Sequence, residues 1–277
     1  MANLRDIKQQ IDSTETIRML TQALGDIATA KLKETRGSMQ HTVDYFQQVS
    51  VLYRTVKSIA MRGRKPIAQK KKIQSTMVIL LTSNSRLYGG LDNGVTKFFY
   101  DNTLKIDCDR IVVGTFGAEI LRALTYPHPF ENNNFKKDDP TFDELQALAA
   151  KVFSHERILV FYSKFRTLLN QEPFISDIST SYLEDTKTTS PFHYITEPEV
   201  EKILAFFDNQ ISFLLFQAIF LEVNLSRLAA RMTSINQAEI NAGKELKKEQ
   251  KTLLKLKKQL TNLRILETYS GRKIESI

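Results

Sequence analysis

Two glycine-containing segments are, by residue type and position, the best candidates in this sequence for binding a phosphate group. The first, Leu87-Tyr88-Gly89-Gly90-Leu91-Asp92-Asn93-Gly94, lies between a predicted strand and a predicted helix, as phosphate-binding loops do. The second, Gly114-Thr115-Phe116-Gly117, follows the next predicted strand. Neither contains G-x-x-x-x-G-K-S/T or G-x-G-x-x-G, and the first has no Lys or Ser/Thr placed for a nucleotide and Mg²⁺. We therefore expect Gly89 and Gly90 to form a structural turn, with no cofactor bound.

The remaining reactive residues give no pattern for catalysis or metal binding. Cys108 is the only cysteine, which excludes an intramolecular disulfide and a multi-cysteine zinc site, and the four histidines are scattered. No G-x-S-x-G or H-E-x-x-H occurs. The adjacent carboxylates Asp138/Asp139 and Asp143/Glu144 fall in a predicted loop and at a helix start, where acidic residues favour the helix dipole. The sequence therefore predicts a chain without a catalytic site or a metal.

Composition and charge narrow the class of protein and its partners. The chain has 277 residues, of which 42% are hydrophobic and 25% charged, as in soluble proteins. The net charge of +8 is concentrated at 63–72 and at 244–258, and the second segment lacks interleaved aromatic residues. This pattern favours an acidic protein partner or a solvated face over nucleic acid. No signal peptide and no apolar run near 18 residues was identified, so we expect a cytoplasmic protein that does not insert into the membrane.

The sequence predicts two very long helices, one at each end of the chain. All seven prolines lie between Pro66 and Pro198, so both ends of the chain are free of helix breakers. Apolar residues recur at helical spacing from Leu4 to about Met61, and again from Pro198 to about Leu266. Helices of this length need a partner along one face. We expect the two to form an antiparallel coiled coil; the alternative is a dimer in which the helices remain separate.

The middle of the chain has a different pattern. Three short apolar runs rich in β-branched residues, at 74–82, 110–114 and 157–161, predict strands, and 93–100 and 142–153 predict helices between them. This alternation is typical of β-α-β units and a mostly parallel, Rossmann-like sheet. The predicted organisation is an N-terminal coiled-coil helix (1–62), an inserted α/β domain (63–197) and a C-terminal coiled-coil helix (198–277). The phenylalanine-rich run at 206–220 is expected to pack on the inserted domain.

Several phrases in these elements, taken together, resemble the γ subunits of F1-type rotary ATPases. Leu4–Thr16 resembles the opening I-K-x-x-I-x-S-x-x-T phrase of that family, and Ser83–Asp92 resembles its S-D-R-G-L-C-G-G-L-N turn. Glu222–Asn241, which contains Ala229-Ala230-Arg231-Met232, resembles the E-x-x-x-S-E-x-x-A-R-M phrase of the last helix. Further matches occur at 20–32, 162–165 and 194–198. The resemblance runs through the whole chain in the same order.

The resemblance implies a central rotor shaft without catalytic activity of its own. In the family, the coiled coil lies on the axis of a ring of α and β subunits, and the inserted domain contacts an ε subunit and a c-ring at the membrane. It implies one copy per complex and a peripheral position on the inner face of a bacterial cell membrane. The residues expected to contact β are Arg18, Gln22, Arg231 and Asn241, and those expected to face the ring or ε are Thr196 and Glu197.

The sequence departs from the family pattern at several places. Arg227 stands where the family has a glutamate, Gln22 where it has a lysine, and the C-terminal end at 270–277 is charged. Three interpretations therefore stay open. The first is the shaft of a proton-coupled ATP synthase. The second is the shaft of an F1-like ATPase that drives another machine, such as surface gliding. The third is an unrelated coiled-coil adaptor.

Overall fold

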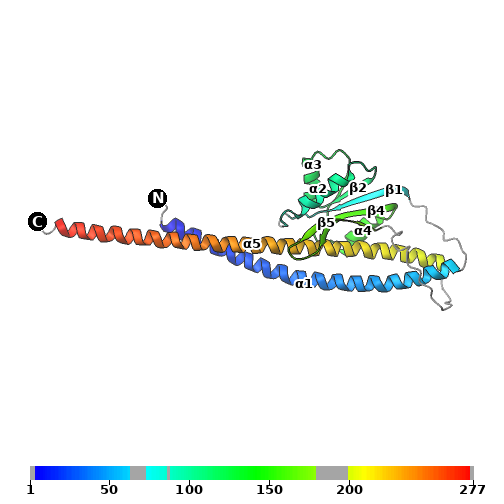
Figure 1. Ribbon diagram of the computed structural model, residues 1–277, viewed down its shortest axis with the longest axis horizontal. Helices are drawn as coiled ribbons and strands as arrows, with labels where there is room; N and C mark the ends of the chain where they lie inside the picture. The colour runs from blue at the N-terminus through cyan, green and yellow to red at the C-terminus, as the bar shows by residue number, and fades with distance from the viewer. Residues whose placement is uncertain (1–3, 63–72, 86–87, 179–198, 275–277) are drawn as a thin grey trace. The chain divides into compact units, whose positions relative to one another are not determined.

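The computed structural model describes residues 4–62, 73–85, 88–178 and 199–274 (Figure 1). Its elements are α1 (Leu4–Arg62), β1 (Ile73–Leu81), α2 (Leu91–Thr103), β2 (Asp109–Val113), α3 (Thr115–Ala123), β3 (Glu131–Asn133), α4 (Phe142–Val152), β4 (His155–Phe165), β5 (Gln171–Asp177) and α5 (Val200–Ile274). The chain divides into two compact units. We call Ala30–Arg231 the sheet unit, and Met1–Thr29 with Met232–Ile277 the helix-pair unit.

The sheet unit is built on a five-stranded sheet in the order β3-β2-β1-β4-β5. The pairs β1–β2, β1–β4 and β2–β3 are parallel, whereas β5 pairs with β4 antiparallel. The second half of the central strand β1, residues 77–81, is a continuous apolar run that is buried on both faces of the sheet. Its side chains alternate, so that Val78 and Leu80 face one layer of helices while Ile79 and Leu81 face the other.

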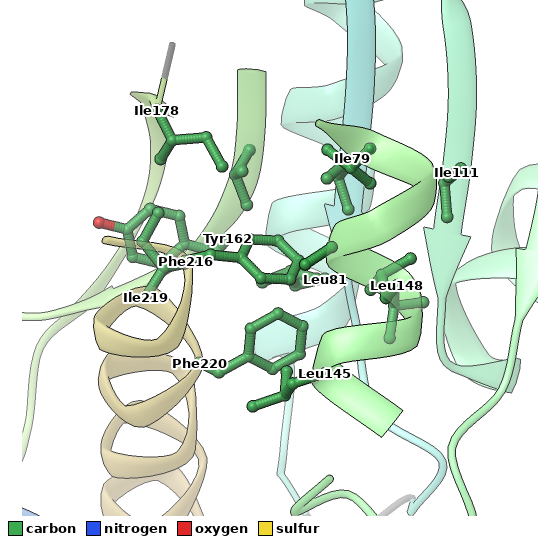
Figure 2. Close-up of a cluster of buried hydrophobic side chains, with 14 of the residues drawn as sticks. Ile79, Leu81, Ile111, Leu145, Leu148, Tyr162, Ile178, Phe216, Ile219 and Phe220 are labelled. Carbon is green, nitrogen blue, oxygen red and sulfur yellow. The ribbon is translucent and has the colours of Figure 1, made fainter. Parts of the chain in front are cut away.

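Each face of the sheet has its own core. On one face, Val78, Leu80 and Val112 pack against Phe99 of α2 and Leu121 of α3. On the other, strand side chains meet α4 and the adjacent part of α5, and Figure 2 shows them converging from these elements: Ile79, Leu81, Ile111, Leu145, Leu148, Tyr162, Ile178, Phe216, Ile219 and Phe220. The helix α5 is therefore part of the helical layer on one face of the sheet, and also one of the two helices of the coiled coil.

Within the sheet unit, α1 runs alongside α5 (Figure 1). Val49 and Tyr53 of α1 are buried against Ile211 and Leu214 of α5. The Tyr53 hydroxyl also donates a 2.9 Å hydrogen bond to Asp208 Oδ1. Apolar packing thus joins the two helices here, and the hydrogen bond from Tyr53 adds a directional polar contact between them.

The helix-pair unit is an antiparallel pair with a sparse core. Ile7, Ala28 and Leu246 are its only buried hydrophobic residues within the described ranges. Gly25 lies against Ile235, and Thr14 Oγ1 donates a 3.2 Å hydrogen bond to Glu249 Oε1. The partner of the earlier α1 residue is the later α5 residue, so the two helices run in opposite directions.

The predicted fold class, an α/β domain with a mostly parallel sheet on an antiparallel helix pair, is confirmed. The predicted helix over 4–61 is α1, and the helix predicted to end near Leu266 continues to Ile274. Three elements were not predicted: α3, β3 and the antiparallel strand β5. The three-part division at 62/63 and 197/198 stays a proposal, because both boundaries adjoin segments outside the described ranges.

The phenylalanine-rich run divides its side chains among three environments. Phe213, Phe216 and Phe220 pack on the sheet, as expected, while Phe207 packs against α1 and Phe206 is exposed. Contrary to the expectation from sequence, α5 does contain an 18-residue window apolar enough to cross a membrane, although 41% of that window is buried in the structure. A helix that forms part of a folded core passes the same test by composition, and Phe216 and Phe220 lie in such a core.

Candidate functional site at the junction of α5 and the sheet

The two glycine segments lie side by side at the carboxyl edge of the parallel strands. The segment after β1 leads into α2, with Gly89 at φ 62° and Gly90 as the N-cap residue. The segment after β2 leads into α3 through Gly114 at φ 99°. A positive φ of this kind favours glycine, so these residues allow the chain to turn sharply from strand to helix. In doubly wound folds this edge is where ligands bind.

Here the chain's own atoms occupy the anion-binding position of α3. The free backbone N–H groups at a helix N-terminus are what would bind a phosphate. The N–H of Thr115 donates to Asn84 Oδ1 at 3.0 Å, that of Phe116 to the Ser83 carbonyl at 3.1 Å, and that of Gly117 to Thr82 Oγ1 at 3.1 Å. A Cβ built on Gly117 would lie 2.4 Å from that same hydroxyl oxygen. The geometry of a binding loop therefore serves packing within the domain.

A buried arginine of α5, Arg227, also binds main-chain groups at this edge of the sheet. The side chain of Arg227 donates from Nη2 to the Thr82 carbonyl at 2.6 Å and from Nη1 to the Asp138 carbonyl at 2.9 Å. A third, longer bond of 3.4 Å joins Nη1 to Asn224 Oδ1. Burial lowers the pKa of Arg227, and the carboxylates of Asp92 and Asp138 oppose that effect. Since an arginine starts so far above neutrality, the group stays charged.

The two carboxylates near Arg227 are in different environments. Burial raises the pKa of Asp92, although its oxygens accept hydrogen bonds from the Ser83 backbone and hydroxyl. Burial also acts to raise the pKa of Asp138, but hydrogen bonds from Ser85, the Asn84 N–H and the Tyr88 hydroxyl outweigh it, and the net shift is downward. Asp138 is therefore a stable carboxylate that binds two loops together.

Further contacts along one side of α5 continue this attachment. Tyr162 donates to Glu222 at 2.9 Å, the hydroxyls of Ser163 and Ser226 are 2.7 Å apart, and Arg231 donates to the Tyr88 hydroxyl at 2.9 Å. The guanidinium of Arg231 also lies over the Tyr88 ring, 4.7 Å from its centroid. We call Glu222, Ser226, Arg227 and Arg231, with their partners on the domain, the α5 clamp.

The pKa values in the α5 clamp fit a mechanical role. Burial, with the hydrogen bond to Asp138, raises the pKa of Tyr88 to about 12. Burial raises the pKa of both Tyr162 and Glu222 as well. No group in the clamp is poised as a nucleophile, and the described ranges contain no cluster of three or more metal-ligating side chains. Most polar groups of the α5 clamp bind one another, although Nε of Arg227 and Nε of Arg231 are buried without a hydrogen-bond partner. These contacts hold α5 to the sheet.

The structure places the predicted contact residues in both units. Arg18, Gln22 and Asn241 are exposed in the helix-pair unit, where Asn241 accepts a 3.1 Å hydrogen bond from Gln237. Arg231 lies in the sheet unit, bound to Tyr88. The role of all four as β contacts stays a prediction. Thr196 and Glu197 lie outside the described residues.

The α5 clamp was not predicted from sequence: of its α5 residues only Arg231 was singled out, and as a contact to β. Arg227 was noted only as a departure in charge from the family pattern, and Asp138 only as an acidic residue in a loop. The available signal was an arginine within the apolar repeat of the predicted helix, next to Leu225, Ser226 and Leu228. A charge on the apolar side of a helix indicates a buried partner, because an unpaired charge there would be very costly.

The helix-pair unit has the second notable surface. Large hydrophobic side chains stay exposed on α1, at Ile17, Met19, Leu20, Leu24 and Ile27. On α5 the exposed ones are Ile240, Leu254, Leu260, Leu263, Ile265, Leu266 and Tyr269. Exposed apolar surface of this extent marks a site of interaction with another protein.

Comparison with known proteins agrees with the resemblance predicted from sequence. A family model described as ATP synthase matches residues 3–268. The ATP synthase gamma chain of Bacteroides fragilis is 24% identical over 290 residues, covering 98% of this chain and 99% of that protein. The gamma chain of an Exiguobacterium species is 25% identical over 254 residues, covering 87% and 88%.

Solved structures share the fold. The rotor of the Euglena gracilis mitochondrial ATP synthase superposes with a TM-score of 0.60 at 14% identity, covering 93% of this chain and 98% of that one. A chain of the Tetrahymena thermophila mitochondrial ATP synthase central stalk and c-ring gives a TM-score of 0.53 at 18% identity, covering 81% and 98%. Because the family model spans nearly the whole chain and the Bacteroides fragilis gamma chain matches over 98% of this chain and 99% of its own length, this protein belongs to the ATP synthase γ-subunit family.

Proposed function

We propose that this chain is the central shaft of an F1-type rotary ATPase, which couples its own rotation to ATP synthesis or hydrolysis at the interfaces between α and β subunits. The observation that carries the proposal is the surface of the helix-pair unit, within a chain that matches the family over residues 3–268. An antiparallel pair that buries so few of its own hydrophobic residues, and leaves Ile17, Leu20 and Leu24 about half exposed, needs a surrounding partner.

The mechanism we propose requires no catalytic residue in this chain. A shaft with unlike sides presents different contacts to each surrounding β subunit, and so stabilises a different conformation in each. Turning the shaft then shifts which conformation each subunit occupies, and nucleotide affinity changes with it. The exposed side chains of Arg18, Gln22 and Asn241 would supply directional contacts to β within the otherwise apolar surface.

The proposed partners extend beyond the ring of α and β subunits. We propose a single copy of this chain per complex, with an ε subunit and a c-ring at the α/β domain. The complex would lie on the inner face of a bacterial cell membrane, with this chain as a peripheral component. The lysine-rich segment 244–258 supports an acidic partner, since all of its lysines are exposed, including Lys248, which pairs with Glu245 at 2.9 Å.

The test is a native pull-down of this chain from membranes, with subunits and copy numbers measured by mass spectrometry. We expect three α, three β, one copy of this chain and a c-ring. Recovery of an α/β hexamer with other partners in place of a c-ring would support an F1-like motor that drives a different machine. Recovery as a homodimer without nucleotide-binding subunits would refute the shaft and support the adaptor.

A further inference from the structure

We propose that Arg227 is a positioning residue that transmits torque between the α/β domain and α5. This inference rests on the proposed function, because torque passes through the chain only if it is a shaft. The guanidinium binds the main-chain carbonyls of Thr82 and Asp138 at 2.6 and 2.9 Å. These two carbonyls belong to different loops at the carboxyl edge of the sheet. One side chain therefore joins α5 to two separate parts of the domain.

Thr82 passes this connection on to the centre of the sheet. Its backbone N–H and its hydroxyl both donate to the Val113 carbonyl of β2, at 2.8 and 2.7 Å. The same hydroxyl accepts from the Gly117 N–H of α3 at 3.1 Å. A displacement of Arg227 therefore acts on β1, β2 and α3 together, and no single loop takes up the movement.

Asp138 provides a second path that returns to α5. Its side chain accepts from the Asn84 N–H and from the Tyr88 hydroxyl, and Tyr88 in turn accepts from Arg231. Arg227 and Arg231 are one helical turn apart on the same side of α5. The path from α5 through Arg227, Asp138, Tyr88 and Arg231 is therefore closed. A closed set of contacts opposes sliding of α5 in either direction along its axis.

The apolar contacts beneath the α5 clamp are less directional than its hydrogen bonds. Phe216, Ile219 and Phe220 hold α5 against the sheet by burial, which is non-directional. Helices packed only by such contacts slide past each other by small shear movements. Hydrogen bonds from a planar, buried guanidinium to two fixed carbonyls are directional. The carbonyls would also be left without these donors if α5 moved.

Three variants separate this role from a general effect on folding. Arg227→Met keeps the length and apolar stem but removes all donors. Arg227→Lys keeps the charge but cannot span both carbonyls. The matched control is Arg157→Met, which removes an exposed arginine of β4 that pairs with Asp177 at 3.2 Å.

The first measurement is torsional stiffness in the assembled complex with α and β subunits. A bead is attached to the sheet-containing domain of this chain through Lys97→Cys in a Cys108→Ser background. The angular fluctuations of the bead are recorded while the ring of α and β subunits is fixed to a surface. We expect stiffness to fall in Arg227→Met, to be only partly restored in Arg227→Lys, and to equal the parent value in Arg157→Met. Parent-like stiffness in both Arg227 variants would overturn the proposal.

The second measurement is amide hydrogen exchange of the full-length chain, which remains informative if Arg227→Met does not assemble. In Arg227→Lys we expect exchange at Thr82–Ser85 and along 218–231 to accelerate by about tenfold to a hundredfold, the effect of losing a charged hydrogen bond. Exchange in residues 7–28 should not change. If exchange accelerated equally through the whole chain, the effect of Arg227 would be on global stability, and the proposed local role would be refuted. If the unsubstituted chain binds no α/β hexamer, the proposed function fails, whereas an assembled complex insensitive to Arg227 removes only this inference.

Discussion

Helix α5 is one continuous helix that meets two different environments. In the sheet unit it is enclosed by the sheet and by α1, so that Ile211, Leu214, Phe216, Val223 and Ala229 are almost completely buried. In the helix-pair unit, α1 is the only described element that packs against the same apolar repeat. There Leu246 is buried, while Leu254, Leu260 and Leu263 stay exposed. The same apolar repeat is therefore buried in the half of α5 that packs on the domain, and partly exposed to solvent in the other half.

The difference shows that apolar residues at helical spacing predict an apolar face, but do not indicate which element or partner covers that face. A pair of helices shields one stripe of each member, and residues beside that stripe stay in water unless a third body covers them. We therefore expect substitutions in the sheet-covered half of α5 to act on the stability of the chain. Substitutions in the helix-pair unit should act on assembly.

The largest expected effect on stability is at Phe216, whose side chain is 0% exposed in the core shared by α5, α4 and the sheet. Phe216→Ala removes a whole ring from a close-packed site and should destabilise the chain by about 3–5 kcal/mol. The control is Phe206→Ala on the same helix, at 63% exposure, where the effect should be within about 0.5 kcal/mol. Chemical denaturation of both variants measures the difference. Equal losses would contradict the contrast drawn between covered and uncovered positions.

Next in size is the effect of polar substitutions on assembly. The double variant Leu20→Gln/Leu24→Gln changes two exposed side chains of the helix-pair unit. Its unfolding free energy should stay within about 0.5 kcal/mol of the parent. Its affinity for the α/β hexamer should fall by about tenfold to a hundredfold, because both side chains would lie in the interface.

This assembly prediction is measured by titrating labelled chain into α/β hexamers. Lys33→Gln, an exposed polar position on the same helix, is the control and should bind as the parent does. Unchanged affinity of the double variant would mean that the apolar surface of the helix-pair unit is not where the hexamer binds.

A smaller effect is expected where Thr82 fills the carboxyl edge of the sheet. Gly117→Ala would place a Cβ 2.4 Å from Thr82 Oγ1 and 2.7 Å from its Cγ2, and this side chain is fixed by hydrogen bonds. We expect a loss of about 1–3 kcal/mol from overpacking. In contrast, Gly37→Ala on α1 meets nothing within 4 Å and should gain about 0.5–1 kcal/mol from helix propensity. Thermal or denaturant unfolding of the pair tests the opposite signs.

The smallest effect concerns acid stability at Asp138. Its pKa is lowered in the folded chain, so the carboxylate contributes stability above its ordinary pKa, and this is lost as the pH falls through the lower folded value. Because the group is half exposed, we expect about 1 kcal/mol or less. Asp138→Asn should therefore be less stable than the parent at pH 7, and the difference should shrink below pH about 4. Asp139→Asn, which changes the adjacent acceptor of Asn224, is the control. A constant difference across pH would argue against this role of the Asp138 charge.

Much of the fold could be predicted because its signals are local. Proline-free ends with apolar helical spacing gave α1 and α5, and the apolar runs gave β1, β2 and β4. The strand β5 was missed because Gln171–Asp177 contains Pro173 and Glu172 and pairs at a sheet edge, where burial is incomplete. The helix α3 is only nine residues long and begins directly after Gly114, so it offered too few turns for a period to be recognised.

The family was indicated by the resemblance of several phrases to those of known γ subunits. Beyond that, what the sequence determined by itself was the type and order of α1, β1, α2, β2, α4, β4 and α5, and the absence of G-x-x-x-x-G-K-S/T and G-x-G-x-x-G in the glycine loops. These follow from spacing and residue type along the chain. Only the tertiary structure decided that Thr82, Ser83 and Asn84 occupy the N-terminus of α3, and that Arg227 reaches the carbonyls of Thr82 and Asp138. Arg227 is 145 positions from Thr82 and 89 positions from Asp138 in the chain. No local pattern reports such a contact, because it depends on how the strands place their carboxyl ends and on which side of α5 packs against the sheet.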